Sequence, residues 1–237
     1  MEDIKTEKIS LKVSDDSEMD VHAAFPNDNE KHPGILVFQE AFGVNHHIRN
    51  IAERFAKLGY VAAAPELYHR TQSGFEGSYD NFDAIREHMQ ATNTETLTAD
   101  IKATYEWLNN NSHVKKNNIV SIGFCLGGRV SFIANVAVEL KAAVSFYGAG
   151  IVETLLDRIN EISAPQLMFW GGLDKHITSD KVAKVNEELK KQNKKYVNVV
   201  FSQADHGFFN DQRSVYNPEA AGQAWELVKQ FLKTYLD

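Results

Sequence analysis

The turn that holds the single cysteine, Cys125, constrains the fold of this chain more than any other segment. Residues 118–124 are rich in β-branched and aromatic side chains and predict a buried strand, and a helix is expected from 126 to about 138. Between them the chain reads Gly-Phe-Cys-Leu-Gly-Gly, and only glycines leave room for so sharp a strand-to-helix turn. This pattern is a G-x-S-x-G nucleophile elbow with cysteine in place of serine. A lone cysteine can also be a small buried hydrophobe.

Two further strands are followed by residues that could assist such a nucleophile. Asp174 comes just after the apolar run 166–172, and His206 follows the run 197–202. The order nucleophile, acid, histidine is the one that α/β-hydrolases require. Ligands of open α/β sheets bind at the carboxyl ends of the strands, where all three residues are expected. The sequence therefore predicts a catalytic triad of Cys125, Asp174 and His206.

The rest of the chain alternates between β and α patterns. Strands are expected at 34–38, 60–64 and 142–146, and residues 6–13 and 19–25 form an opening hairpin. Helices are expected at 48–58, 81–90, 94–110, 151–159, 179–191 and 219–235. This alternation predicts one α/β domain over residues 1–237, an α/β-hydrolase fold. Its mostly parallel central sheet would carry an antiparallel hairpin at one end and helices on both faces.

Composition narrows the functional classes. A net charge of −7 and a pI near 5.7 argue against a nucleic-acid partner, which would need a basic stripe. No apolar run reaches the roughly 18 residues of a membrane span, and the charged N-terminal segment lacks a signal-peptide core. One cysteine suits a reducing, cytoplasmic setting.

His46 and His47 have no acidic or cysteine partner at ligand spacing, so we expect neither a metal nor a cofactor. Either a monomer or a homodimer is compatible with the sequence.

Five segments together resemble the dienelactone hydrolase family, whose members are carboxymethylenebutenolidases of the α/β-hydrolase superfamily. They are Gln-Glu-Ala-Phe-Gly-Val-Asn (39–45), Pro-Glu-Leu-Tyr (65–68), Gly-Phe-Cys-Leu-Gly-Gly (123–128), Phe-Tyr-Gly-Ala-Gly (146–150) and Asp-His-Gly-Phe (205–208). The resemblance runs from about residue 34 to the C-terminus. It implies hydrolysis of an enol-lactone or a similar ester by the triad named above.

The same resemblance assigns three more groups. Glu40, at the end of the 34–39 strand, would interact with Cys125 and take up its proton when substrate binds. The alternative for an isolated glutamate is a solvated loop carboxylate. The backbone N–H groups of Ala41 and Leu126 would form the oxyanion hole, and such donors typically stabilise the transition state by about 3 kcal/mol each.

Substrate recognition departs from the family pattern. Dienelactone hydrolases hold the substrate carboxylate with two arginines, one of them four residues beyond the catalytic histidine. This chain has the uncharged Asn210 at that position, and Asn210 is a candidate substrate-binding residue. The resemblance leaves Arg86 and Arg70 as candidates for the other arginine, although an ion pair or a surface charge is an equal alternative. Tyr147 matches a pocket-lining tyrosine of the family, or it is a buried aromatic at a strand end.

The nucleophile itself limits the substrates. A thiolate leaves a tetrahedral intermediate more readily than an alkoxide, so a plain alkyl ester would revert to starting material. We therefore expect activated esters or enol-lactones, cleaved through an acyl-thioester. A thioesterase or a carboxylesterase for another activated ester is an alternative. A redox-sensing or binding protein on this scaffold is a more remote one.

Overall fold

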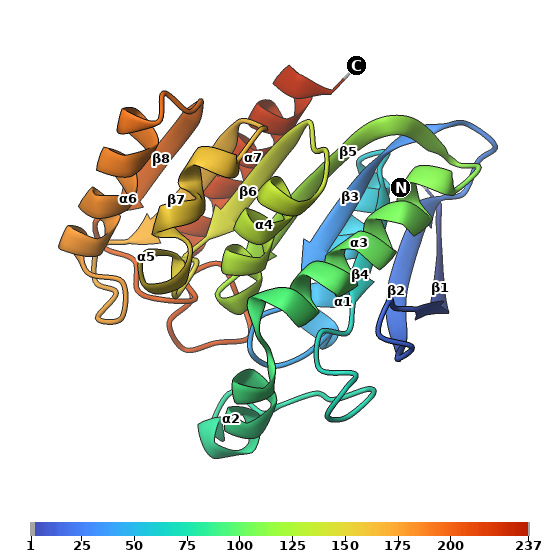
Figure 1. Cartoon of the computed structure of the whole chain (residues 1–237), viewed down its shortest axis with the longest axis horizontal. Coiled ribbons are helices and arrows are strands. Elements are labelled where there is room, and N and C mark those ends of the chain that lie inside the picture. The colour runs from blue at the N-terminus through green and yellow to red at the C-terminus, as the bar shows by residue number, and fades with distance from the viewer. Residues whose placement is uncertain (1–2, 237) are drawn as a thin grey trace.

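The structure is a computed structural model that describes residues 3–236. One mixed sheet runs through these residues in the order β1-β2-β4-β3-β5-β6-β7-β8 (Figure 1). β1 pairs antiparallel with β2 and β2 antiparallel with β4, whereas the remaining neighbours are parallel. The strands are β1 (Ile4–Lys12), β2 (Glu18–Pro26), β3 (His32–Phe38), β4 (Val61–Pro65), β5 (Val114–Phe124), β6 (Ala142–Phe146), β7 (Gln166–Gly171) and β8 (Tyr196–Phe201).

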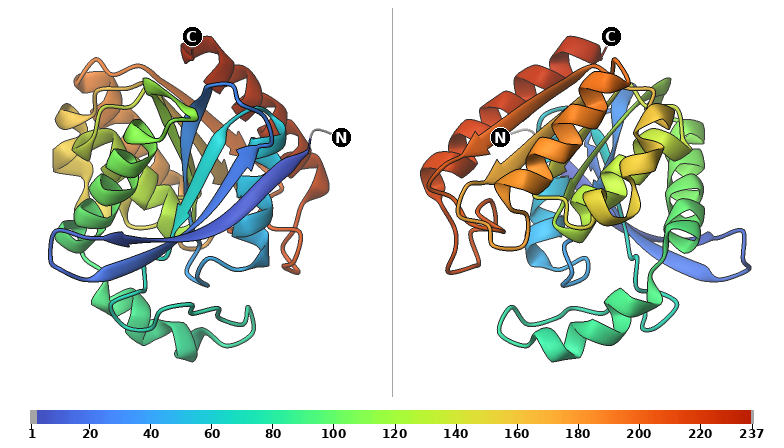
Figure 2. Two further views of the ribbon diagram at one scale, coloured as in Figure 1. Left: turned by 90° about the vertical axis from the view of Figure 1, so that its right-hand side faces the viewer. Right: turned by 60° about the vertical axis from the view of Figure 1, so that its left-hand side comes forward.

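Helices cover both faces of the sheet. They are α1 (His46–Lys57), α2 (Phe82–Ala91), α3 (Thr94–Asn110), α4 (Leu126–Ala137), α5 (Ile151–Thr154), α6 (Ser179–Lys191) and α7 (Pro218–Tyr235), with a 3₁₀ turn η1 (Leu156–Glu161). α3, α4 and α6 lie on one face, and α1 and α7 lie on the other (Figures 1 and 2). Phe55 of α1 and Trp225 of α7 meet there with ring centroids 5.0 Å apart. α2 lies beyond the edge at which the parallel strands end.

The central strands are mainly apolar because both of their faces are covered. Every residue of β4, β6 and β7 is buried, as expected for parallel strands between two helical layers. β1, at one edge, is mostly exposed. The carboxyl ends of β3, β5, β6, β7 and β8 therefore meet at one edge of a closed core, and the loops that leave this edge carry the candidate site.

The predicted α/β architecture is confirmed, including the opening hairpin and the helices on both faces. α3, α6 and β6 have the predicted bounds. β5 begins at Val114, before the expected start at 118, because exposed polar residues at 115–117 conceal the strand in the sequence. The predicted helix 151–159 is broken at Leu155, whose φ of −133° and ψ of 0° lie outside the helical region, so a 3₁₀ turn follows α5.

Candidate active site

Cys125 sits between β5 and α4 in a strained conformation. Its φ is 55° and its ψ is −113°, a region that costs a residue with a side chain of the order of 1–3 kcal/mol. Its backbone N–H donates to the carbonyl of Phe146 at 3.0 Å, which ties the turn to β6. The thiol side chain is half-buried. The turn therefore presents the sulfur at the carboxyl edge of the sheet.

Two glycines make this turn sterically feasible. A Cβ on Gly127 would lie 2.2 Å from the carbonyl oxygen of Phe38, and a Cβ on Gly123 would lie 1.9 Å from the carbonyl oxygen of Gly127. Both distances are far inside van der Waals contact, and in each case the obstacle is backbone that cannot move aside. The glycines of the motif are thus required by the close packing of α4 against β3.

His206 and Asp174 follow adjacent strands and are bonded to each other. Nδ1 of His206 lies 2.7 Å from Oδ2 of Asp174. The other oxygen, Oδ1, accepts the backbone N–H groups of His176 and Ile177 at 2.7 and 3.0 Å. Burial raises the pKa of Asp174, but the hydrogen bonds from His206 and the two N–H groups outweigh it, so the pKa lies below its ordinary 3.8. The carboxylate stays ionised and fixes the orientation of the imidazole.

The imidazole of His206 is also coupled to the cysteine. Burial lowers the pKa of His206, but the charge of Cys125 and hydrogen bonds to Asp174 and Cys125 raise it to about 10, from an ordinary 6.5. His206 is therefore hydrogen-bonded to the acid and lies near enough to Cys125 for the charge of the sulfur to act on it. A nucleophile, a base and an orienting acid require this order of contacts.

Glu40, just after β3, is almost completely buried, with 1% of its surface exposed. Its Oε2 accepts a 2.6 Å hydrogen bond from Nδ2 of Asn210, and its Oε1 accepts a longer one, 3.4 Å, from the hydroxyl of Tyr147. The ring of Tyr147 lies against that of His206, with centroids 5.0 Å apart. Glu40 is therefore a buried carboxylate held by two donors, one of which, Tyr147, packs against His206. The alternative of a solvated loop carboxylate is wrong.

The two predicted oxyanion donors have free N–H groups. Leu126 is the first residue of α4, where backbone N–H groups have no partner within the helix. Within residues 3–236, neither the N–H of Leu126 nor that of Ala41 donates to another group. The carbonyl of Ala41 accepts the hydroxyl of Tyr68 at 3.1 Å, which holds the loop after β3 in place.

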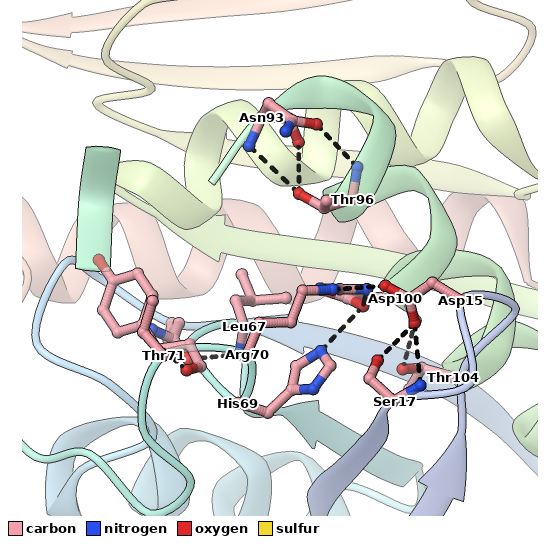
Figure 3. A network of polar contacts seen from close by, with 12 residues as sticks. Asp15, Ser17, Leu67, His69, Arg70, Thr71, Asn93, Thr96, Asp100 and Thr104 are labelled. Carbon is pink, nitrogen blue, oxygen red and sulfur yellow. Dashed lines mark hydrogen bonds and ion pairs between the residues drawn. The ribbon is translucent and has the colours of Figure 1, made fainter. Parts of the chain in front are cut away.

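Arg70 is part of a separate network that links α3 to the turn between β1 and β2 (Figure 3). Its Nη1 and Nη2 bind both carboxylate oxygens of the fully buried Asp100 at 3.0 and 2.9 Å, and its Nε binds Asp15 at 2.6 Å. His69 adds a contact of 3.1 Å to Asp100. Because this guanidinium is engaged on both sides, Arg70 has the ion-pair role that the sequence left open.

Arg86 and Asn210 are likewise not arranged as expected for substrate contacts. Arg86 is exposed on α2 and binds Asp83 of the same helix at 2.7 Å. Asn210 is completely buried, and its amide bridges Glu40 and the hydroxyl of Tyr79, 3.1 Å away. The residue at the position of the family's arginine therefore fixes a carboxylate of the site.

A polar cavity of about 820 Å³ adjoins this network between the 76–82 segment and the 212–214 loop. Tyr79 and Arg213 line it, whereas Cys125 does not. Tyr79 connects the cavity to the site through its contact with Asn210. Its size is that of a small-molecule site, so it is a candidate approach to the cysteine.

Sequence reasoning overlooked one arginine near the site, Arg129 in the first turn of α4. Arg129 could have been noticed, because an arginine one turn after a helix N-terminus opposes the helix dipole. The described part of the chain holds no group of three side chains suited to a metal ion. No helix within residues 3–236 combines the length and the apolar character that a membrane crossing needs.

Comparison with known proteins gives a consistent result. The profile of the dienelactone hydrolase family matches residues 19–236. A Synechocystis protein provisionally named carboxymethylenebutenolidase is 35% identical over 99% of this chain and 98% of its own length. An Escherichia coli O157:H7 protein with the same provisional name is 32% identical over 86% of this chain and 77% of its own. The crystal structure of a provisionally named dienelactone hydrolase from Klebsiella pneumoniae superposes with a TM-score of 0.91 and 28% identity, covering 98% of this chain and all of the other.

Proposed function

Because the chain belongs to the dienelactone hydrolase family and is a carboxylic ester hydrolase, we propose that Cys125 is its nucleophile and that it cleaves activated esters or enol-lactones. The observation that carries this proposal is the hydrogen-bonded pair of Asp174 and His206 beside the half-buried cysteine of the elbow. A purely structural cysteine would not need a buried acid and a histidine aligned on it.

In the first half of the reaction, the sulfur of Cys125 bonds to the carbonyl carbon of the substrate. The electron pair of the C=O bond moves to oxygen, where the N–H groups of Ala41 and Leu126 stabilise the negative charge. The intermediate then reforms the carbonyl, breaks the bond to the leaving oxygen and leaves an acyl-thioester. His206, protonated in the resting pair, gives its proton to the leaving group.

In the second half, water attacks the thioester carbonyl and gives a proton to His206. The carbon–sulfur bond breaks and returns Cys125 as a thiolate, with the acid as product. Asp174 stabilises the imidazolium each time it forms. In molecules whose Cys125 still holds its proton, Glu40 takes up that proton when substrate binds, and its supporting donors are Asn210 and Tyr147.

The choice of substrate follows from the leaving groups. A tetrahedral intermediate that contains both a thiolate and an alkoxide expels the thiolate, so simple alkyl esters are not consumed. Enolate, phenolate and thiolate groups leave readily, so enol-lactones, aryl esters and thioesters are turned over. Asn210 is uncharged and its side chain is turned toward Glu40. It therefore does not favour the family's lactone over another activated ester.

The test compares 4-nitrophenyl acetate, a dienelactone and ethyl acetate as substrates of the wild type, Cys125→Ala and Cys125→Ser. We expect Cys125→Ala to lose all activity, and Cys125→Ser to gain alkyl-ester hydrolysis relative to aryl-ester hydrolysis. Activity on 4-nitrophenyl acetate alone would keep the mechanism and assign another substrate. Undiminished activity in Cys125→Ala, or equal wild-type rates on alkyl and aryl esters, would disprove the proposal.

A further inference from the structure

Arg129 is a half-buried arginine one helical turn beyond Cys125. Its backbone N–H bonds to the carbonyl of Cys125 at 3.3 Å, so the two residues are neighbours on one side of α4. Its Nε is enclosed by protein and makes no hydrogen bond. No carboxylate within residues 3–236 pairs with its guanidinium. An unpaired, partly buried charge is costly, and one beside a nucleophile is typical of a functional group.

The surroundings of Arg129 increase this cost. The side chain follows the loop after β6, where a Cβ on Gly150 would lie 3.1 Å from its Nη1 and 3.3 Å from its Cδ. Burial lowers the pKa of Arg129, and the nearby Cys125 and Tyr68 offset this only in part. The cation also stands at the N-terminus of α4, where the helix dipole repels positive charge.

The other arginines show how this chain ordinarily accommodates a guanidinium. Four of them have acidic partners, and a fifth lies over an indole ring; they are Arg49 with Glu76, Arg70 with Asp100, Arg86 with Asp83, Arg158 with Glu161, and Arg54 at 3.9 Å from the Trp225 ring. Arg213 faces the cavity and packs over Phe42, with its Cζ 5.6 Å from the ring centroid. Arg129 is therefore the unpaired guanidinium on the helix of the nucleophile.

We propose that Arg129 binds a carboxylate carried by the acyl part of the substrate, so that the enzyme selects esters of dicarboxylic acids. This inference rests on the proposed function. A guanidinium binds a carboxylate through two parallel hydrogen bonds, the most directional contact available to an anion. Four helical residues span about 6 Å, so the anion lies several bonds from the carbonyl that Cys125 attacks.

The position of His206 indicates that the carboxylate bound by Arg129 is on the acyl part of the substrate and not on the leaving group. The leaving group must lie beside His206, which protonates it. His206 contacts Asp174 and the ring of Tyr147, and within residues 3–236 no hydrogen bond or ring contact joins it to Arg129. Arg129 instead lies beside Gly150, in the loop that follows β6. The anion that it binds is therefore on the portion of the substrate that stays attached to sulfur.

The experiment compares two aryl esters with the same leaving group, 4-nitrophenyl butyrate and the half-ester 4-nitrophenyl hydrogen glutarate. kcat/KM is measured for the wild type, Arg129→Gln and Arg129→Lys, and for Arg158→Gln as a matched control that removes an arginine from a surface pair. We expect Arg129→Gln to lower kcat/KM for the glutarate ester by about 10- to 100-fold while butyrate changes by less than about 2-fold. Arg129→Lys should retain an intermediate preference, and Arg158→Gln should match the wild type.

The outcomes separate the inference from the proposed function. An equal fall for both esters, with a shifted pH profile, would mean that Arg129 acts on the thiolate and would overturn the inference. An unchanged glutarate preference in a folded Arg129→Gln variant would overturn it as well. Cys125→Ala is assayed in parallel: if it keeps the wild-type rates on both esters, the proposed function fails whatever Arg129 does.

Discussion

Asn210 donates a 2.6 Å hydrogen bond to Oε2 of Glu40, and both side chains are buried. This pair joins the loop after β8 to the end of β3 across the site. The second carboxylate oxygen of Glu40 accepts only the longer contact from Tyr147. Asn210 is thus the principal neutral donor that makes a buried carboxylate tolerable beside the cysteine.

Replacing Asn210 by Asp should make stability depend on pH. The change keeps the shape but sets a second carboxylate where the amide donates to Glu40, and two adjacent carboxylates bind a proton that one alone releases. We expect a loss of about 3 kcal/mol in the free energy of unfolding at pH 8 and a smaller loss at pH 5, where the shared proton restores a donor. Urea unfolding at both pH values measures this loss in the free energy of unfolding. A loss of equal size at the two pH values would contradict this view of the pair.

Adding a methyl group to the elbow should disrupt it. Gly127→Ala places a Cβ 2.2 Å from the carbonyl oxygen of Phe38 and 2.5 Å from that of Gln39, so we expect a loss of more than about 4 kcal/mol or failure to fold. Gly222→Ala is the matched control, since nothing lies within 4 Å of its Cβ in α7. That variant should gain about 0.5–1 kcal/mol from helix propensity. Thermal unfolding of the two variants tests this prediction. Similar Tm values would show that the close approach of α4 to the end of β3 is unimportant for stability.

The ion pair of Asp174 and His206 should stabilise the chain over a defined pH window. The pKa of Asp174 is lowered from 3.8, so its contribution is present above that pH and is lost as the pH falls through the lower folded value. The pKa of His206 is raised from 6.5 to about 10, so its contribution is complete below 6.5 and is lost as the pH rises through 10. Asp174→Asn should therefore cost most stability at about pH 5–6 and little near pH 10. A stability deficit that stays constant from pH 5 to pH 10 would contradict the pairing.

The alternation of strands and helices was predictable because covered parallel strands leave nearly continuous apolar runs such as β6 and β7. Cys125, Asp174 and His206 could be nominated because each follows such a run at the carboxyl edge. The exact geometry of their contacts could not be predicted, since the conformations of the loops after β5, β7 and β8 have no simple pattern in the sequence.

The supporting residues were harder to predict, for physical reasons. Asn210 was considered as a substrate contact by its spacing from the histidine, but its side chain turns inward because Glu40 needs a donor. Arg70 was considered as a substrate contact because of its position in the sequence. In the structure it forms an ion pair with Asp100, which is distant in sequence on α3. Such pairings depend on which helix covers which loop, a tertiary property that local patterns do not contain.

The network around Asp100 should be structural. Asp100→Asn removes a fully buried charge that pairs with Arg70, so we expect a loss of about 3–5 kcal/mol in the free energy of unfolding. Asp83→Asn, which breaks an exposed pair with Arg86, should leave the Tm nearly unchanged and serves as the control. Denaturant unfolding of both variants tests the contrast. Equal small effects would mean that this network contributes little to stability.

The proposed acyl-thioester on Cys125 is tested most directly by mass spectrometry of the enzyme quenched with acid during turnover of 4-nitrophenyl acetate. The account predicts one added acetyl group per chain, located on the peptide that contains Cys125, and none on Cys125→Ala. An acetyl group on another residue of an enzyme whose activity survives Cys125→Ala would contradict it.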